Sequence, residues 1–352
     1  MASLSCVSII IPCRNERGFI GICLESIISN DYPKQALEVL VVDGMSEDGT
    51  PAIVMDYAQK YSFITLLENP QKITPSALNI AIRKAKGEII MRMDAHASYD
   101  RDYISKCVRA LCEYSADNVG GVWRIVPRAD TLVGRAIARS LSHRFGVGNA
   151  HYRLANCRQP KWVDTVPFLC CRKEVFQRIG LFNENLRRGQ DMEFSLRLRQ
   201  AGGRTLLVPD IASCYFARSD MKAFWQHNWT NGVWAILPFL YSDIVPVSWR
   251  HLVPLAFVVS LLTSAGLAMR SPTGLWILGS LAGVYTGASL AASLQVSWRE
   301  RDPRYLALMP LVFSSLHIGY GLGSLWGVVR TFAVVLSGLD RRRQKDGGSA
   351  EA

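Results

Sequence analysis

The first 115 residues alternate between short apolar segments and longer segments in which apolar residues recur every three or four positions. Short apolar runs bounded by turn residues predict buried strands, and the longer periodic segments predict helices. The predicted strands are Val7–Ile11, Glu38–Val42, Phe63–Leu67 and Glu88–Met93, and the predicted helices are 16–29, 51–61, 75–86 and 102–114. Because strands and helices alternate, we expect an α/β fold with a mostly parallel sheet and helices on both faces.

The last hundred residues follow a different pattern, because they contain long stretches without charge. Leu252–Met269 and Ser271–Ser297 contain no Asp, Glu, Lys or Arg, and neither does Tyr305–Val329, whose one basic side chain is His317. Each stretch is long enough to cross about 30 Å of hydrocarbon as a helix. The third contains three glycines between 319 and 323, so it predicts either one crossing or a pair of short helices hinged there.

These patterns divide the chain into four regions. Residues 1–220 are predicted to form a globular domain, and 251–339 a transmembrane domain of three or four helices. The segment 221–250 contains several tryptophans just ahead of the apolar stretches, which predicts an amphipathic helix at the membrane interface. A packed amphipathic helix is the alternative for this segment. Residues 340–352 are predicted to be a basic, disordered cytoplasmic tail.

The chain has a formal net charge of +11, with much of the excess between 124 and 161. Attraction to anionic membrane lipids would explain this cluster at about 1 kcal/mol per basic residue near the surface. A solvated basic face is the alternative. No nucleic-acid-binding module is recognisable, so nucleic acid is not expected as a partner.

Several familiar signatures are missing from the chain. The apolar run Cys6–Ile11 is too short for a secretory signal, so we expect the globular domain to stay in the cytoplasm. Nine cysteines without paired or zinc-like spacing suit a reducing compartment. Neither the glycine-rich dinucleotide fingerprint nor an ATPase phosphate loop is present, which argues against nicotinamide, flavin and ATP-hydrolysing enzymes.

Asp94 and His96 directly follow the apolar run Glu88–Met93. Open α/β sheets bind ligands at the carboxyl ends of their strands. A carboxylate and an imidazole at alternate positions can point to one side and share a divalent cation, which could then hold a diphosphate. The pair therefore predicts chemistry on an activated phosphate compound.

The acidic positions Asp43, Asp94, Asp164 and Asp191, with their flanking residues, resemble the inverting nucleotide-sugar glycosyltransferases of family 2. The matching segments are Val7–Glu16, Asp43–Thr50, Gly87–His96 and Gln190–Asp191. A narrower resemblance is to membrane-attached enzymes of bacterial exopolysaccharide assembly, of the succinoglycan glucosyltransferase type. It lies in Arg92–Ala97, Gly134–Ala138, Arg144–Gly148 and Val163–Pro167. The resemblance implies the GT-A fold, a Rossmann-like nucleotide-sugar-binding domain with a mixed, mostly parallel sheet, followed here by C-terminal transmembrane helices.

The resemblance also implies which residues bind the donor, a UDP-sugar. Pro12, Asn15 and Glu16 would contact it at the start of the first helix. Asp43 would accept a hydrogen bond from the uracil, and Asp94 would reach the ribose or the cation. From the residues alone, Asp43 could instead cap a turn, and Asn15 could cap the first helix.

A divalent metal, Mn²⁺ or Mg²⁺, is implied as cofactor, with Asp94 and His96 as its ligands. His96 departs from the second Asp that is commoner in the family. Imidazole suits Mn²⁺ better than Mg²⁺, which prefers oxygen ligands. A protonated His96 could instead bind a phosphate oxygen directly.

Asp191 is implied as the catalytic general base, with Glu193 as a fallback. Its predicted place at the first turn of a helix should lower its pKa through the helix dipole. From the residues alone, a helix-capping acid is the alternative for Asp191.

The implied function is transfer of a hexose, with glucose as the expected sugar, from a UDP-sugar to a saccharide linked to polyprenyl diphosphate. The reaction would belong to exopolysaccharide biosynthesis at the bacterial inner membrane, with the catalytic domain cytoplasmic and other polysaccharide-assembly proteins as further partners. A polyprenyl-phosphate sugar synthase and a catalytically inactive membrane scaffold are the alternatives. Processive synthesis is not expected, because Gln226–Trp229 lacks the Arg of the synthase Gln-x-x-Arg-Trp motif.

Overall fold

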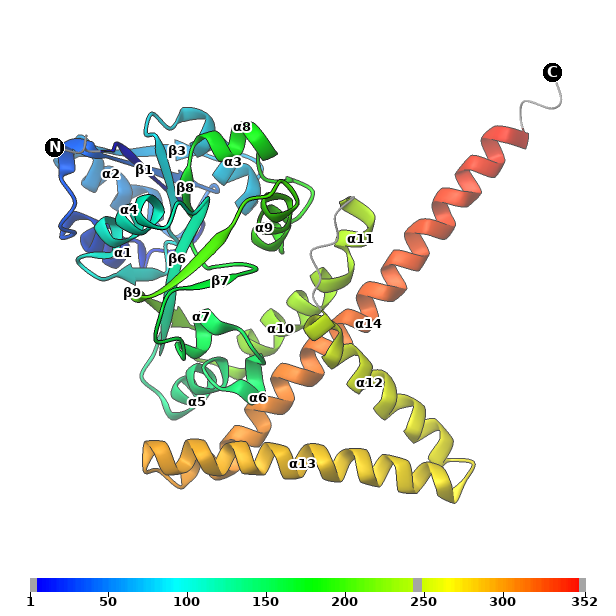
Figure 1. Ribbon diagram of the computed structural model, residues 1–352. Coiled ribbons are helices and arrows are strands. Elements are labelled where there is room, and N and C mark those ends of the chain that lie inside the picture. The colour runs from blue at the N-terminus through cyan, green and yellow to red at the C-terminus, as the bar shows by residue number, and fades with distance from the viewer. Residues whose placement is uncertain (1–4, 243–248, 348–352) are drawn as a thin grey trace. The chain divides into compact units, whose positions relative to one another are not determined.

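The computed structural model describes residues 5–242 and 249–347 and separates the chain into two compact units (Figure 1). The first, here called the sheet unit, comprises Met1–Arg128 and Asn149–Ala217. The second, here called the helical unit, comprises Ala129–Gly148 and Arg218–Ala352. The sequence predicted an unbroken globular domain to residue 220, so the assignment of Ala129–Gly148 to the helical unit is a difference from that prediction.

The sheet unit contains one mixed sheet with the strand order β3-β2-β1-β4-β8-β6-β9-β5, and β7 pairs with β9. The strands are β1 (Val7–Cys13), β2 (Leu37–Asp43), β3 (Ile64–Glu68), β4 (Ile89–Arg92), β5 (Ala97–Tyr99), β6 (Asn118–Pro127), β7 (Lys161–Val163), β8 (Cys170–Arg172) and β9 (Thr205–Ala217). The four strands β1 to β4 run parallel to one another, as predicted. The antiparallel β8 then joins this half to the pair β6 and β9.

Helices cover both faces of this sheet (Figure 1). They are α1 (Ile20–Ile28), α2 (Thr50–Lys60), α3 (Thr74–Lys84), α4 (Tyr103–Glu113), α7 (His151–Leu154), α8 (Glu174–Ile179) and α9 (Gln190–Gln200), with a short 3-10 turn at Lys34–Ala36. Ile9 and Val41 point toward α1, α2 and α4, whereas Ile10 and Val42 point toward α3, α8 and α9. Because alternate residues face opposite sides and both sides are covered, the central strands are continuously apolar.

The strand register places the ends of β1, β2 and β4 at one edge of the sheet. Cys13 of β1 lies opposite Asp43 of β2, and Ile10 of β1 lies opposite Arg92 of β4. The segments that follow these strands, including Asp94, therefore leave the sheet at the same edge.

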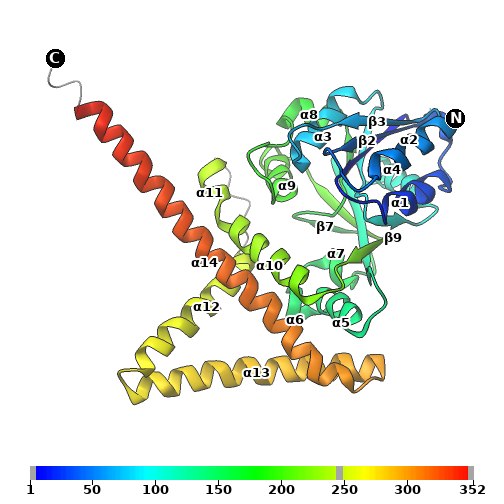
Figure 2. The same cartoon turned by 180° about the vertical axis from the view of Figure 1, so that it is seen from behind.

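The helical unit consists of α5 (Leu132–Leu141), α6 (Arg144–Val147), α10 (Met221–Ile236), α11 (Pro238–Tyr241), α12 (Trp249–Ala268), α13 (Pro272–Glu300) and α14 (Arg304–Gly347), seen from behind in Figure 2. Within the described residues, three segments are long and apolar enough to cross a membrane: Arg250–Ala268, Pro272–Glu300 and Arg304–Ser337. The apolar face of α5 explains why Ala129–Gly148 belongs here, because Ile137 packs in one core with Phe313 of α14 and Val296 of α13.

The third apolar stretch forms one continuous helix, α14, and not a hinged pair. A Cβ atom at Gly323 would lie 2.1 Å from the carbonyl oxygen of Trp229, and one at Gly321 would lie 2.3 Å from that of Pro254. On the opposite helix, a Cβ at Gly232 would lie 2.0 Å from the carbonyl oxygen of Tyr320. The glycines therefore allow the backbones of α10, α12 and α14 to approach closely, as small residues do between membrane helices.

Two further features of α14 follow from its sequence. Its backbone stays helical through Gly347, where a disordered segment was predicted from Asp340, because Arg, Lys and Gln favour helices and extending a helix costs less than starting one. Residues 348–352 lie outside the described part of the chain. His317 is held inside the unit, with Nε2 3.0 Å from the Phe145 carbonyl oxygen and Nδ1 3.0 Å from the Tyr285 hydroxyl.

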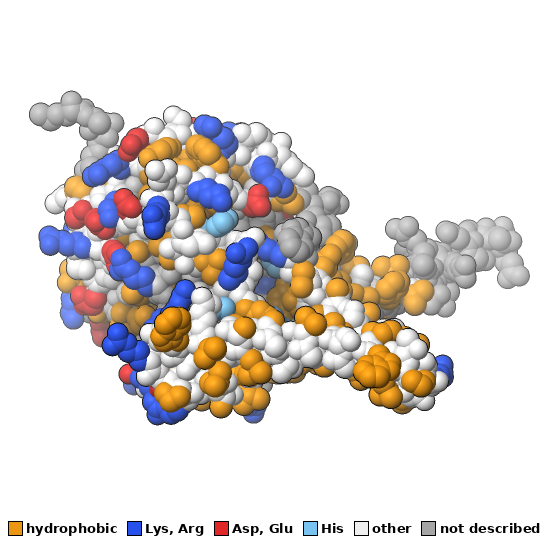
Figure 3. All heavy atoms as spheres, turned by 60° about the horizontal axis from the view of Figure 1, so that its bottom comes forward, with side chains coloured by type: hydrophobic (Ala, Val, Ile, Leu, Met, Phe, Trp, Pro, Cys, Tyr) orange, Lys and Arg blue, Asp and Glu red, His pale blue; other side chains and the backbone are white. Residues whose placement is uncertain are grey.

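The outer face of α13 is rich in apolar side chains, which form much of the orange surface in Figure 3. Its exposed apolar residues are Leu275, Trp276, Ile277, Val284, Leu290, Leu294 and Trp298. An exposed apolar surface of this length is typical of contact with lipid and unusual on a protein surrounded by water.

Candidate active site

A cleft of about 190 Å³ opens at the carboxyl edge of β1, β2, β3 and β4. The predicted residues Pro12, Glu16, Asp94 and His96 all line it. Asp43, the last residue of β2, and Asn15, in the loop after β1, lie next to the lining residues Gly44 and Glu16. Asp191 reaches the cleft through Arg92, as described below. The structure therefore brings Glu16 and His96, which are 80 residues apart in the sequence, together in one cleft.

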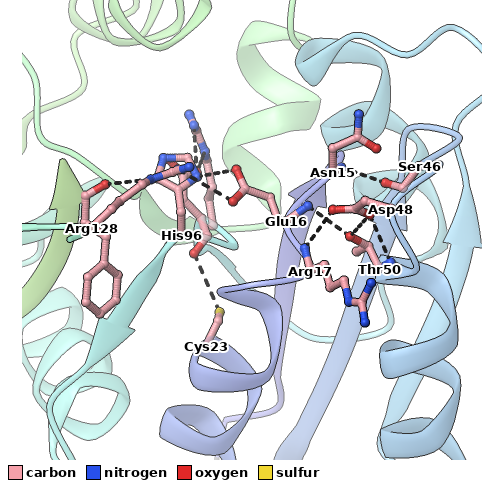
Figure 4. Close-up of polar contacts among 12 residues, drawn as sticks. Asn15, Glu16, Arg17, Cys23, Ser46, Asp48, Thr50, His96 and Arg128 are labelled. Carbon is pink, nitrogen blue, oxygen red and sulfur yellow. Dashed lines mark hydrogen bonds and ion pairs between the residues drawn. The ribbon is translucent and has the colours of Figure 1, made fainter. Parts of the chain in front are cut away.

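The rim of the cleft is built from the loops after β1 and β2, which are hydrogen-bonded to each other (Figure 4). Asn15 has a left-handed backbone, with φ 54°, and its N–H donates to Ser46 Oγ at 2.8 Å. The Arg17 N–H donates to Asp48 Oδ2 at 3.0 Å. Helix α1 begins only at Ile20, so Asn15 is not the cap of that helix.

Asp43 is buried and its carboxylate caps the turn that follows β2. Its Oδ2 accepts the Ser46 N–H at 2.8 Å, and its Oδ1 accepts the Ser46 hydroxyl at 2.5 Å. This is the turn-capping arrangement that the residues alone allowed. A contact between Asp43 and a base stays a prediction.

Glu16 lies between His96 and Arg128 (Figure 4). Its Oε1 is 3.0 Å from His96 Nδ1, and its Oε2 is 3.6 Å from Arg128 Nη2. Arg128 in turn lies over the Phe19 ring, with 4.5 Å between the guanidinium carbon and the ring centroid. The Glu16 carboxylate thus orients His96, and the other ring nitrogen, Nε2, is the one that a ligand would meet.

Arg92, the last residue of β4, is buried between the two carboxylates expected to do the chemistry. Its Nε and Nη2 donate to Asp94 Oδ1 at 3.0 and 2.9 Å, and its Nη1 donates to Asp191 Oδ1. No role was predicted for Arg92 from the sequence. A signal was present, however, because an Arg inside an apolar strand must find an anionic partner.

Asp191 lies in the first turn of α9, as predicted, and 43% of its side-chain surface is exposed. Desolvation by the surrounding protein raises the pKa of Asp191, and the Arg92 guanidinium opposes that rise. The predicted lowering by the helix dipole is therefore wrong in direction, because desolvation is the larger effect.

The other predicted acids are not part of the cleft. Glu193, the fallback base, is buried and accepts two hydrogen bonds from Arg197, at 2.6 and 2.9 Å, so its carboxylate is already paired. Asp164 is exposed and pairs with Arg199 at 2.8 Å.

The cleft is also lined by Arg14, Asn69 and Lys72, for which no role was predicted from the sequence. The two cations suit a diphosphate. Asn69 Nδ2 donates to the Ile73 carbonyl oxygen at 2.9 Å, while its buried Oδ1 has no hydrogen-bond partner within the described residues. An acceptor left unpaired in a cleft is suited to an N–H of a bound ligand.

The side chains present fit a metal ion that is shared with a ligand. Within residues 5–242 and 249–347, no group of three or more His, Cys, Asp and Glu side chains could hold an ion. Asp94 and His96 line the same cleft and supply one oxygen and one nitrogen ligand type. A diphosphate would have to complete the coordination, because Mn²⁺ and Mg²⁺ prefer six ligands with several oxygens among them.

The chain is similar to known glycosyltransferases. Residues 8–180 match the family model described as glycosyl transferase family 2. The chain is 26% identical to the dolichyl N-acetyl-alpha-D-glucosaminyl phosphate 3-beta-D-2,3-diacetamido-2,3-dideoxy-beta-D-glucuronosyltransferase of Methanococcus voltae, over 92% of this chain and 97% of that one. It is 27% identical to the succinoglycan biosynthesis protein ExoA of Rhizobium meliloti, over 90% and 92%.

Among solved structures, the mannosyltransferase PcManGT from Pyrobaculum calidifontis, in complex with GDP-Man and Mn²⁺, has the same fold. The match has a TM-score of 0.56 and 23% identity, and covers 92% of this chain and 88% of that one. The GT-A fold inferred from the sequence is confirmed.

Proposed function

We propose that the chain, whose residues 8–180 match glycosyl transferase family 2, transfers a hexose, with glucose as the expected sugar, from a UDP-sugar to a saccharide linked to polyprenyl diphosphate. The observation that carries this proposal is the meeting of Asp94 and Asp191 on one buried guanidinium beside the cleft. A transferase that inverts the anomeric carbon needs a donor-binding group and a base near one centre, and this arrangement supplies both.

The roles of the residues follow from their positions. Arg14 and Lys72 would bind the diphosphate, and the loops carrying Pro12, Asn15, Glu16 and Asp43 would hold the nucleoside. A divalent ion at Asp94 and His96 would neutralise charge on the departing diphosphate. The Asp191 carboxylate would accept the proton of the acceptor hydroxyl as its oxygen bonds to the anomeric carbon, and the bond from that carbon to the diphosphate oxygen breaks to release UDP.

A lipid-linked acceptor is supported by two observations. The relatives from Methanococcus voltae and Rhizobium meliloti match nearly the whole chain, and their descriptions refer to a dolichyl phosphate sugar and to succinoglycan biosynthesis. The helical unit contains three helices that are long enough to cross a membrane. We therefore place the protein in the bacterial inner membrane with its sheet unit in the cytoplasm, where anionic lipids and other polysaccharide-assembly proteins are its expected partners.

The donor and acceptor can be tested together in membranes that contain the protein. UDP-glucose, other UDP-hexoses and GDP-mannose are offered with either a lipid-linked saccharide or bare polyprenyl phosphate. We expect UDP release only with a UDP-sugar and the lipid-linked saccharide, and NMR of the product should show an inverted anomeric carbon. Transfer to polyprenyl phosphate alone would indicate a sugar synthase, and no nucleotide release from any donor would indicate a scaffold.

The base is tested by Asp191→Asn. Because general-base catalysis contributes about 100-fold to 10,000-fold, we expect kcat to fall by at least about 100-fold with little change in UDP affinity. Asp164→Asn is the matched control, since Asp164 is an exposed acid paired with Arg199. Full activity of Asp191→Asn would exclude Asp191 as the base.

A further inference from the structure

Arg92 links two parts of the sheet unit that are far apart in the chain. Asp94 lies two residues after it, in the segment that follows β4, whereas Asp191 lies 99 residues away in α9. Both carboxylates contact the same guanidinium through their Oδ1 atoms. One side chain therefore joins the donor side of the cleft to the helix that carries the proposed base.

This link is persistent for electrostatic reasons. Arg92 is buried, and an arginine in a protein does not lose its proton, so it has to keep anionic partners. Asp94 and Asp191 are these partners, and both contact the buried guanidinium directly.

The shape of the guanidinium adds a geometric constraint. The edge formed by Nε and Nη2 faces Asp94, and Nη1 faces Asp191. Because the five N–H groups of an arginine lie in one plane, the position of one carboxylate fixes the direction of the other. A lysine ammonium has its three donors on a single atom and cannot set this relation.

We propose that Arg92 is a positioning residue for sugar transfer, which holds the Asp191 carboxylate in a fixed relation to Asp94 so that the base is aligned with the donor before the acceptor arrives. This inference rests on the proposed function. It predicts that loss of the guanidinium slows transfer through Asp191 while the donor still binds.

The first experiment compares full-length wild type, Arg92→Lys and Arg92→Met. We expect both variants to lower kcat by at least about 100-fold, the amount attributable to a general base. The Kd of UDP, measured by calorimetry without Mn²⁺, should change by less than about fivefold, because Arg14, Lys72 and the rim loops that would bind UDP are unchanged. If Arg92→Met does not fold, the test rests on Arg92→Lys, which keeps the positive charge beside Asp94 and Asp191 but loses the planar guanidinium.

Arg197→Lys is the matched control for a purely structural role. Arg197 also anchors α9, through two hydrogen bonds to Glu193 and further ones to the Leu181 and Ile179 carbonyl oxygens, but it does not contact the cleft residues. We expect this variant to lower the thermal unfolding temperature while kcat stays within about fivefold of wild type. A loss of kcat as large as that of Arg92→Lys would mean that anchoring α9 is the whole effect.

The second experiment is a double-variant cycle with Asp191→Asn. If Arg92 acts through Asp191, the double variant should be no slower than Asp191→Asn alone, within about threefold. If the two substitutions lower kcat independently, so that their effects multiply in the double variant, the inference is wrong. It is also wrong if Arg92→Lys has the kcat of wild type. Either result would leave the proposed function intact. A wild-type protein that transfers no sugar from any donor would overturn the proposed function itself.

Discussion

The His96 imidazole is oriented by a carboxylate, and this determines which nitrogen can meet a ligand. Glu16 Oε1 accepts the Nδ1 proton at 3.0 Å, so Nε2 is left for the cleft. Outer carboxylates of this kind fix the tautomer of a metal-binding histidine and increase its basicity, and their loss costs about 10-fold to 100-fold in metal affinity. The structure places Glu16 where it orients His96, and its contact with the donor stays a prediction.

At this scale we predict that Glu16→Gln weakens Mn²⁺ binding about 10-fold when UDP is present, because the charged partner of His96 is lost. Calorimetry or Mn²⁺ spin resonance would measure this without catalysis. Mn²⁺ alone should bind weakly to wild type, since Asp94 and His96 supply too few ligands. Glu47→Gln is the control, because Glu47 is exposed on the same rim. Equal affinity in Glu16→Gln and wild type would contradict the role of Glu16.

The same residues show how far the sequence could predict the site. Asp94 and His96 were recognisable because they end an apolar run, and strand ends carry ligands. Arg92 was not, because its importance depends on Asp191, which reaches it only after 99 further residues have folded. The direction of the Asp191 pKa shift was also missed, since a helix start is visible in a sequence and desolvation is not.

At the scale of elements, the hydrophobic pattern predicted those strands and helices whose formation depends mainly on nearby residues. The strands β1 to β4 were predicted from apolar runs, and they form because both faces of each strand are covered. The segment Ala129–Gly148 could not be assigned in this way, because α5 contacts α13 and α14, more than 150 residues later in the chain. The glycines of α14 look like breaks in a sequence, but in the structure they are contact points.

We predict that Gly323→Ala destabilises the helical unit by about 1–3 kcal/mol, because the new Cβ would overlap the Trp229 carbonyl oxygen. The control is Gly283→Ala in α13, where a Cβ meets no atom within 4 Å. There alanine should be neutral or should stabilise by up to about 1 kcal/mol, because it favours helices. Thermal unfolding in detergent measures both. Equal effects at the two sites would argue against close packing of α10 and α14.

At the scale of the whole molecule, charge at the helix ends predicts sidedness. The turn between α12 and α13 carries Arg270 alone, whereas the connection of α13 to α14 carries Arg299, Arg301 and Arg304. Positively charged connections stay in the cytoplasm, so we expect α12 and α13 to cross as a pair. A third crossing by α14 would export the segment that contains Arg341, Arg342, Arg343 and Lys345.

We therefore predict that the C-terminus is cytoplasmic and that α14 does not cross. Alkaline phosphatase and green fluorescent protein fused after Ala352 report the two sides, because the former is active only outside and the latter only inside. Fluorescence with no phosphatase activity is expected, and a fusion after Arg270 should give the reverse. Phosphatase activity after Ala352 would show that all three helices cross.

The chain passes between its two units three times, after Arg128, after Gly148 and after Ala217. A simple design for a water-soluble fragment would truncate the chain after β9. That shortened protein would still carry α5, whose buried Ala136 and Ile137 would have lost the helices that cover them. It should aggregate, whereas a version that also replaces Ala129–Gly148 with a short polar linker should stay in solution. Because the chain enters the helical unit at Ala129 and returns at Asn149, a soluble fragment has to lack Ala129–Gly148 as well as the residues after β9.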